Sequence, residues 1–201
     1  MIKRNLVVMS LAVLLSACGF QLRGTGDADF ALEEINLQAR DSHGQTVKQL
    51  EDLLERSDVR VHPGATYSLN LANERNTQRT ASYTGSARSA EYELTSVLDY
   101  EFLGSGNTVL LRDSIETRRV YVHDSNNVIG SSQEGEQLRQ EMRRELIQQL
   151  VMRIQRVSPT QLDQLQQTAD AKARAEAEAL EAQRREREAK PQQSPIQFPA
   201  Q

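Results

Sequence analysis

Apolar and polar residues alternate along several stretches of the chain, as they do in β-strands that bury one face. The strongest alternation is "YELTSVLDYEF", residues 92–102, where Val97 is the only apolar residue on the polar side. Its apolar side carries Tyr92, Leu94, Leu98, Tyr100 and Phe102. Residues 32–39 and 67–76 alternate over shorter lengths. These three stretches predict three strands of a half-buried sheet.

A fourth strand is predicted over residues 107–124, directly after the hairpin signal Gly-Ser-Gly-Asn. Its alternation slips near Asp113 and Ser114, which predicts a bulge or a bend at that point. A brief extended piece, "VRVHPG", is expected before Pro63 and Gly64 interrupt the chain.

Two stretches carry the three- and four-residue spacing of amphipathic helices. The first is 46–56, with Val47 and Leu50 on its apolar face. The second is 131–157, where Ser131 and Glu134 have the spacing of a capping box and predict the start of the helix. A longer apolar stripe follows in this second stretch: Leu138, Met142, Leu146, Leu150, Ile154 and Val157.

Composition changes after Pro159, which ends the second helix because proline disfavours helical geometry in the residue before it. Gln, Ala, Glu and Arg dominate residues 159–201. We expect a partly helical tail with no apolar face wide enough to pack on a core, and disorder from Pro191 onward.

The order of elements predicts an α+β fold. Two amphipathic helices and a sheet with one apolar face bury their surfaces by packing on each other. We therefore predict a two-layer sandwich, in which two helices pack on a mostly antiparallel four-stranded sheet. The expected organisation is a cleaved signal peptide over 1–17, a lipid-anchored linker over 18–31, the α+β domain over 32–158, and the tail over 159–201.

Composition excludes several classes of function. The net charge of −4 argues against nucleic acid as a partner, since nucleic-acid-binding domains are usually basic. Aromatic residues make up 4% of the chain and Trp is missing, which leaves little surface for stacking on sugars or bases. Cys18 is the only cysteine, so an intrachain disulfide is impossible.

Reactive groups are few and scattered. The three histidines, His43, His62 and His123, lie in separate turns or strand ends, without metal-ligand spacing. The sequence has neither a G-x-S-x-G nucleophile motif nor a phosphate-binding glycine loop. We expect neither catalysis nor a cofactor.

Arginines are concentrated in the connection between the second and third long strands. Arg75, Arg79 and Arg88 lie there with Glu74 as the only acidic residue among them, and Arg112, Arg118 and Arg119 follow on the next strand. Guanidinium groups bind phosphate through paired, charge-assisted hydrogen bonds. One interpretation is a site for a phosphorylated ligand or an anionic surface. The other is a solubilised hairpin whose arginines protect an edge strand.

The N-terminus has the three parts of a secretory signal peptide: Lys3 and Arg4, a short apolar run, and small residues before Cys18. The run is too short to span a bilayer, which needs roughly 20 apolar residues. Leu15-Ser16-Ala17-Cys18 also resembles a bacterial lipobox, which implies that Cys18 carries N-acyl and S-diacylglycerol groups. Gly19, in place of the Asp that retains such proteins in the inner membrane, implies the outer membrane.

Two further segments carry a family resemblance. "CGFQLRG", residues 18–24, resembles the mature N-terminus of the lipopolysaccharide (LPS)-assembly lipoproteins of the LptE (RlpB) family, and "SAEYEL", residues 89–94, resembles that family's segment after the hairpin. The resemblance covers roughly residues 1–158, and it also fits the order of elements.

Membership would imply an outer-membrane lipoprotein that faces the periplasm and sits as a 1:1 plug in the lumen of a large β-barrel, the LPS translocon. It would assist assembly of that barrel and bind LPS for insertion into the outer leaflet. Basic hairpin residues are implicated in LPS binding within the family, and we take Arg75, Arg79 and Arg88 as candidates here.

Two alternatives remain at this stage. The chain could be a lipid-anchored scaffold or auxiliary subunit of another envelope complex. It could also be a lipid-anchored hydrolase, which the missing catalytic motifs disfavour.

Overall fold

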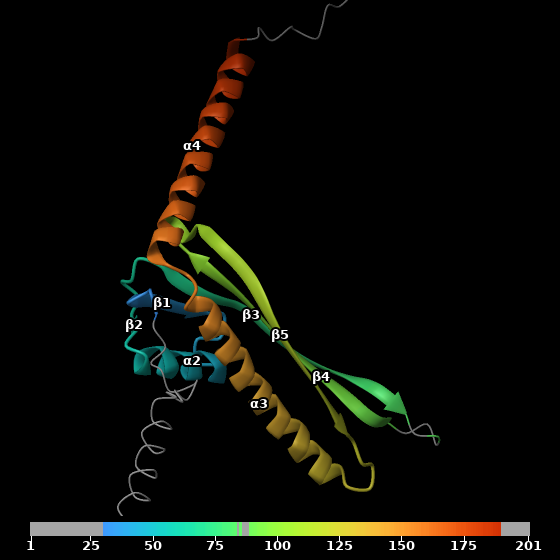
Figure 1. Cartoon of the computed structure of the whole chain (residues 1–201). Coiled ribbons are helices and arrows are strands. Elements are labelled where there is room, and N and C mark those ends of the chain that lie inside the picture. Colours follow the sequence, from blue (N-terminus) through green and yellow to red (C-terminus); the bar gives the residue numbers. More distant parts are fainter. Residues whose placement is uncertain (1–29, 84, 86–88, 190–201) are drawn as a thin grey trace, which may run out of the picture.

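A computed structural model describes residues 30–83, 85 and 89–189 of the chain. It contains one five-stranded sheet with the order β2-β1-β3-β4-β5 (Figure 1). In chain order the strands are β1 (Glu34–Ala39), β2 (Arg60–Val61), β3 (Ser68–Tyr83), β4 (Ser89–Leu103) and β5 (Val109–Val122). The predicted count of four strands was therefore one too low. The extra strand, β2, is the extended piece expected before Pro63, and it pairs with β1.

The predicted α+β class is confirmed. β1 runs parallel to both β2 and β3, while β3, β4 and β5 form an antiparallel meander. The helices among the described residues are α2 (Gln45–Arg56), α3 (Val128–Ile154) and α4 (Pro159–Ala189), with the 3-10 turn η1 (Ser105–Asn107) between β4 and β5. Figure 1 shows α2 and α3 on the same side of the sheet, which gives two layers.

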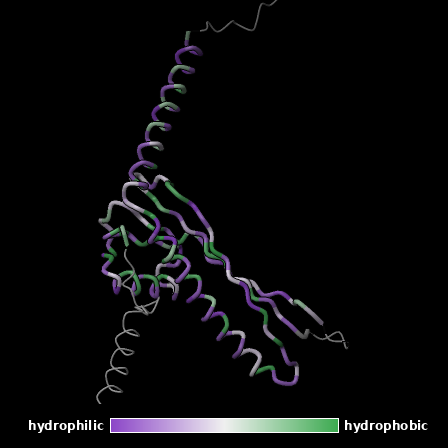
Figure 2. Tube along the Cα trace, in the orientation of Figure 1, coloured by the Kyte–Doolittle hydropathy of each residue, from purple (hydrophilic) through white to green (hydrophobic). Residues whose placement is uncertain are grey.

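The core lies between these helices and the inner face of the sheet. Alternate residues of β4 are buried there, as the sequence predicted, and Leu98 and Phe102 are fully covered. The stripe on α3 covers them with Leu146, Leu150 and Ile154. Figure 2 shows the alternation of hydrophobic and hydrophilic residues along the strands. Each side chain of this size contributes about 1.5–3 kcal/mol when it is fully buried.

Helix α3 begins earlier than the capping box predicted. Asn127 is the N-cap, and its side chain accepts a hydrogen bond from the Gly130 amide at 3.1 Å. Ser131 lies inside the helix, where its hydroxyl accepts from the amide of Asp124 at 2.9 Å. The prediction was wrong because Ser131 fastens the preceding loop to the helix, whereas Asn127 satisfies an orphan amide of the first turn.

The bulge predicted near Asp113 and Ser114 was also misplaced. Pairing between β4 and β5 is regular there and shifts instead between Phe102 and Leu103, opposite Leu111 and Val109. Asp113 lies on the helix-covered face, where its carboxylate pairs with Arg153 of α3. The pattern of apolar and polar residues breaks at Asp113 because this polar residue faces inward, where Arg153 neutralises it.

The described part of the tail forms the helix expected there, α4, with 31 residues, but its start packs on the core, contrary to the prediction that it has no face to dock. The disorder predicted from Pro191 onward lies outside the described residues. Leu162 is fully buried and Leu165 packs partly against the main cluster. Beyond these turns α4 projects away from the sheet (Figure 1). The prediction failed because one buried leucine, with the partly buried Leu165 beside it, is enough to dock a helix on an apolar surface that the core already offers.

Three strands of the sheet continue past the end of β1. Because β1 pairs with β3 only as far as Leu71, the part of β3 after that residue is an open edge. We define the distal ribbon as residues 73–83 of β3 together with the residues of β4 and β5 that continue beside them. A small second cluster covers its inner face, formed by Leu94, Tyr121 and Met142.

Candidate functional site

The outer face of the distal ribbon is the side that neither α2 nor α3 covers. A β-bulge at Ala72 decides which residues of β3 lie on this face, because pairing shifts between Leu71 and Asn73. Before the bulge, Leu71 pairs with the inward-facing Tyr100; after it, Arg79 pairs with the outward-facing Glu93. A one-residue shift moves every later side chain to the other face of the sheet. The bulge thus places Arg75 and Arg79 on the outer face.

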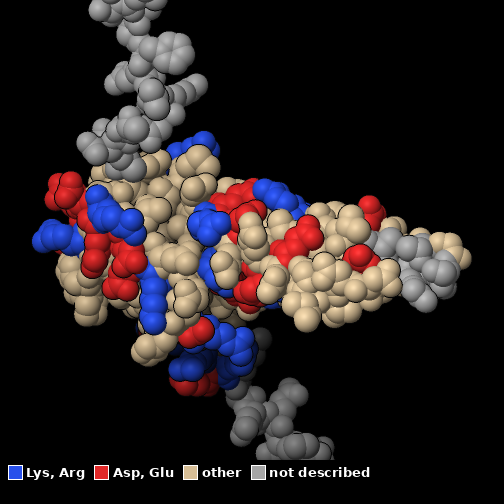
Figure 3. Space-filling view, turned by 90° about the horizontal axis from the view of Figure 1, so that it is seen from below, with Lys and Arg blue, Asp and Glu red and all other residues tan. Residues whose placement is uncertain are grey.

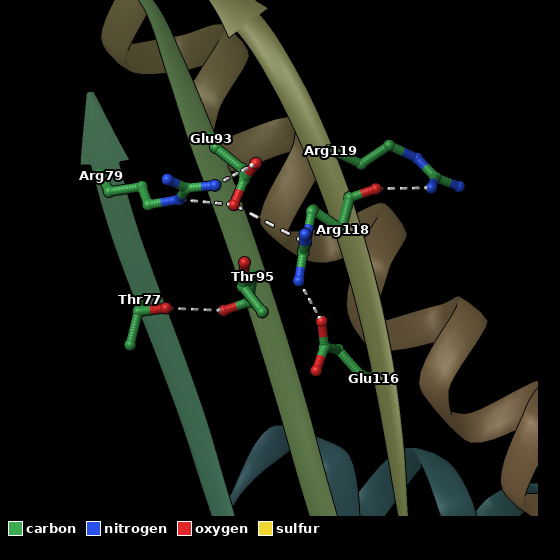
Figure 4. Close-up of polar contacts among 7 residues, drawn as sticks. All are labelled: Thr77, Arg79, Glu93, Thr95, Glu116, Arg118 and Arg119. Atoms are coloured by element: carbon green, nitrogen blue, oxygen red, sulfur yellow. Dashed lines mark hydrogen bonds and ion pairs between the residues drawn. The ribbon is translucent and has the colours of Figure 1, made fainter. Parts of the chain in front are cut away.

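Glu93 lies at the centre of this face and binds two arginines from the neighbouring strands (Figure 4). Arg79 donates from Nε and Nη2 to its two carboxylate oxygens at 2.7 and 3.0 Å. The Nε atom of Arg118 lies 3.6 Å from Oε1 of the same carboxylate. Arg118 also pairs with Glu116 at 2.6 Å. The Arg79 hydrogen bonds hold the pKa of the Glu93 carboxyl below its usual value, and this carboxyl is 11% exposed.

The other outer-face arginines also have carboxylate partners. Arg75, a predicted site residue, lies 3.2 Å from Asp99. At the opposite end of the face Arg112 pairs with Glu101 at 2.6 Å. The interpretation of these arginines as protection of a sheet edge therefore has structural support, because β3 and β5 are the strands that carry them.

Large hydrophobic side chains are exposed at the end of the distal ribbon. Val120 and Val122 follow Arg118 on the outer face of β5, where they are 53% and 63% exposed and oppose Glu93 and Glu91. Other exposed residues lie at the ends of β3 and α3: Tyr83, Val128 and Ile129. The guanidinium of Arg118 and the apolar side chains of Val120 and Val122 are thus successive groups on the outer face of β5.

Two predicted site residues, Cys18 and Arg88, lie outside the described residues. Of the three nominated arginines, the structure places Arg75 and Arg79 on the same face. Arg118 was noted in the sequence but not nominated, and Glu93 was not singled out. The pairing register of β3 and β4 places Arg79 opposite Glu93. That register depends on the bulge at Ala72, which the sequence does not reveal.

The remaining polar groups of the described residues do not gather into a reactive site. His62 contacts Glu34 at 3.3 Å, His43 contacts Ser42 at 3.1 Å, and the ring of His123 packs on Tyr92. In the part of the chain that the structure describes, no group of three or more His, Cys, Asp or Glu is arranged to hold a metal. Across the same residues, no helix has the length and apolar character to cross a membrane.

A cavity of about 530 Å³ opens at the start of α2. Its lining carries both signs of charge, with Arg40 and Arg143 beside Asp41 and Glu74. Thr46 donates to Glu74 at 2.6 Å across it. Figure 3, which shows the molecule from below, has basic and acidic residues interspersed over most of the face, with acidic and no basic residues visible toward the distal end.

Known proteins resemble this chain over the region that forms the sheet and the helices α2 and α3. The family model described as "LptE: Lipopolysaccharide-assembly" matches residues 32–154. The chain belongs to the LptE lipopolysaccharide-assembly family. The resemblance based on residues 18–24 and 89–94 is therefore confirmed at the level of the family, and α4 begins after the matched region ends.

Relatives and solved structures agree with membership of the LptE family. The LPS-assembly lipoprotein LptE of Pectobacterium atrosepticum is 30% identical over 160 residues, which cover 77% of this chain and 86% of that protein. Its counterpart in Yersinia pestis is 26% identical, with coverage of 82% and 81%. The crystal structure of rare lipoprotein B from Shewanella oneidensis has a TM-score of 0.52 and 25% identity, and covers 71% of this chain and 98% of that one. A lipoprotein B from Nitrosomonas europaea, at 20% identity, shares the fold with a TM-score of 0.58, over 68% and 90% of the two chains.

Proposed function

We propose that the chain is the lipoprotein subunit of an outer-membrane LPS translocon. In this proposal residues 1–17 are removed and Cys18 carries the lipid anchor, which holds the protein at the periplasmic side of the outer membrane. The protein occupies the lumen of a large β-barrel in a 1:1 complex, assists its assembly, and binds LPS. It acts by binding and positioning, without catalysis. Family membership and the lipobox-like segment before Cys18 support this proposal.

One observation carries the LPS-binding part of the proposal. On the outer face of the distal ribbon, Arg79 and Arg118 lie beside the exposed Val120 and Val122. LPS is an amphiphile whose phosphate groups lie next to its acyl chains. Guanidinium forks fit the phosphates, and the valines offer apolar area to the chains. Arg75, which lies 3.2 Å from Asp99 on the same face, extends the candidate site. Arg88, nominated from the sequence, lies outside the described residues and stays a candidate.

The experiment compares LPS capture by the purified mature chain and two variants. Arg79→Gln with Arg118→Gln removes both cations at the site. Arg112→Gln is the matched control, because Arg112 is on the same face, is 69% exposed, and pairs with Glu101. We expect the double variant to bind LPS about tenfold more weakly, since two charge-assisted contacts are lost, and the control to bind normally.

Equal LPS binding by the double variant and wild type, with both folded, would rule out this site. A second, broader variant replaces Arg75, Arg79 and Arg88 by Glu. It reverses the charge of all the arginines nominated from the sequence, and we expect LPS capture to fall while the domain stays folded.

The barrel partner is tested separately. The lumen of an outer-membrane barrel is polar, and the outer face of this sheet is polar along most of its length. Extraction of the tethered protein in mild detergent should co-purify one very large β-barrel in equal amount. Recovery of the intact lipoprotein with a different envelope complex would instead support the scaffold or auxiliary-subunit alternative.

A further inference from the structure

Glu93 occupies a position on the outer face that a ligand phosphate would need. Its carboxylate accepts both hydrogen bonds of the Arg79 fork, at 2.7 and 3.0 Å, and lies 3.6 Å from Arg118. A phosphate makes the same two-pronged contact with a guanidinium. The side chain is 11% exposed, so strand and side-chain neighbours hold it in place between the two cations.

Three other carboxylates on this face, Glu101, Asp99 and Glu116, have simpler surroundings. Glu101 pairs with Arg112 and Asp99 pairs with Arg75, each with one arginine. Glu116 pairs with Arg118 but is 48% exposed. Glu93 alone among these four is within ion-pair distance of two arginines.

We propose that Glu93 is a built-in competitor for anions, which makes the Arg79–Arg118 site selective for ligands that bring more than a phosphate group. This inference rests on the proposed LPS-binding function and goes beyond it, because it names the residue that sets selectivity. The tethered carboxylate is always present at a high effective concentration. A small anion gains nothing by replacing one charge-assisted contact with another.

An amphiphile differs from a small anion because it also gains an apolar contact with Val120 and Val122. Val120 lies opposite Glu93 in register, and Val122 lies two residues further along the same face. Successive residues on one face of a strand are about 7 Å apart, within reach of one lipid headgroup and the start of its chains. Apolar burial against the valines therefore offsets the displacement of Glu93, and inorganic phosphate lacks that gain.

A purely structural role for Glu93 makes a different prediction. If Glu93 only joined β3 to β4, its loss would lower stability and leave anion binding unchanged or weaker. If it competes with the ligand, its loss raises affinity for anions. The sign of the change in affinity therefore separates the two roles.

The experiment uses the mature full-length chain as wild type, Glu93→Gln and Glu101→Gln, with LPS micelles and inorganic pyrophosphate as the probes. Glu101→Gln is the matched control, since Glu101 is 13% exposed on the same strand but pairs with a single arginine. We expect Glu93→Gln to bind LPS about fivefold more tightly and to gain binding of pyrophosphate. Glu101→Gln should match wild type with both probes. Glu93→Ser serves as a second variant should Glu93→Gln fold poorly.

The outcomes separate this inference from the proposed function. LPS binding by wild type, with equal or weaker binding by folded Glu93→Gln or Glu93→Ser, overturns the inference and leaves the function intact. Wild type that captures no LPS, beside a glutamine variant that gains pyrophosphate, overturns the function but supports Glu93 as a competitor for anions. Gain of affinity in Glu101→Gln as well would show a general charge effect and would overturn the specific role of Glu93.

Discussion

The hydroxyl of Tyr67, just before β3, donates a hydrogen bond to Asp163 in α4, 96 residues further along the chain. Close by, the amide of Ser105 donates to the side chain of Gln166 at 3.1 Å. With Leu162 fully buried in the core, these bonds join the first two turns of α4 to the residue before β3 and to the turn η1. The region matched by the family model ends at residue 154, so this chain extends the packed body past it.

Replacing Leu162 by Ala should lower the free energy of unfolding by about 2–5 kcal/mol, because a buried leucine leaves a cavity. Leu180→Ala is the control, since Leu180 lies on the same helix and is 53% exposed. The control should change stability by less than about 0.5 kcal/mol. Urea denaturation followed by circular dichroism measures both. Equal stability of the Leu162 variant and wild type would mean that α4 does not pack as described.

Stability should fall at alkaline pH through Tyr67. Burial, together with the hydrogen bond to Asp163, raises the pKa of the Tyr67 hydroxyl to about 12. The unfolded chain has the ordinary tyrosine pKa of about 10. A raised pKa favours the folded state while the group is protonated, so this contribution is complete below about pH 10 and is lost between about pH 10 and 12.

Tyr67→Phe tests this titration. The variant lacks the hydroxyl, and its unfolding free energy should fall less than that of wild type across the same pH range. Thermal melts at several pH values between 8 and 12 provide the comparison. Parallel pH profiles for the two proteins would exclude Tyr67 as the responsible group.

Thr117→Val should stabilise the protein by roughly 1 kcal/mol. The Thr117 hydroxyl is buried beneath α3 and has no hydrogen-bond partner among the described residues. A buried, unsatisfied polar atom costs about 1–3 kcal/mol, and valine has nearly the same shape. The neighbouring Ser96, whose hydroxyl donates to Asn76 at 2.6 Å, is the control, and Ser96→Ala should destabilise the protein. Destabilisation by both changes would show that the Thr117 hydroxyl is satisfied.

Cys18→Ser should abolish incorporation of labelled palmitate, because the thiol is the proposed point of attachment. Acyl chains anchor a protein with about 0.8 kcal/mol for each buried CH₂, so the variant also loses its anchor. Gly19→Asp is the matched variant: it should incorporate label normally and collect in the inner membrane. Labelling of the serine variant would place the modification elsewhere.

Several features followed from the sequence because one local rule governs each of them. Alternation over 92–102 predicted the buried face of β4, and the stripe over 138–157 predicted the buried face of α3. The capping box failed at Ser131 because two hydroxyl roles share one sequence pattern: capping a helix, and binding a preceding loop. The start of α4 was missed because Leu162 is buried by partners distant in sequence.

The outer-face site likewise combines features that the sequence predicted with one that depends on strand pairing. Local composition alone showed that arginines are concentrated between residues 75 and 88 and that the N-terminus resembles a lipidation signal. The sharing of Glu93 by Arg79 and Arg118 depends on strand pairing, because the extra residue Ala72 shifts the register and turns Arg79 outward. A bulge is decided by pairing between strands, and period-two patterns within one strand contain no information about that pairing.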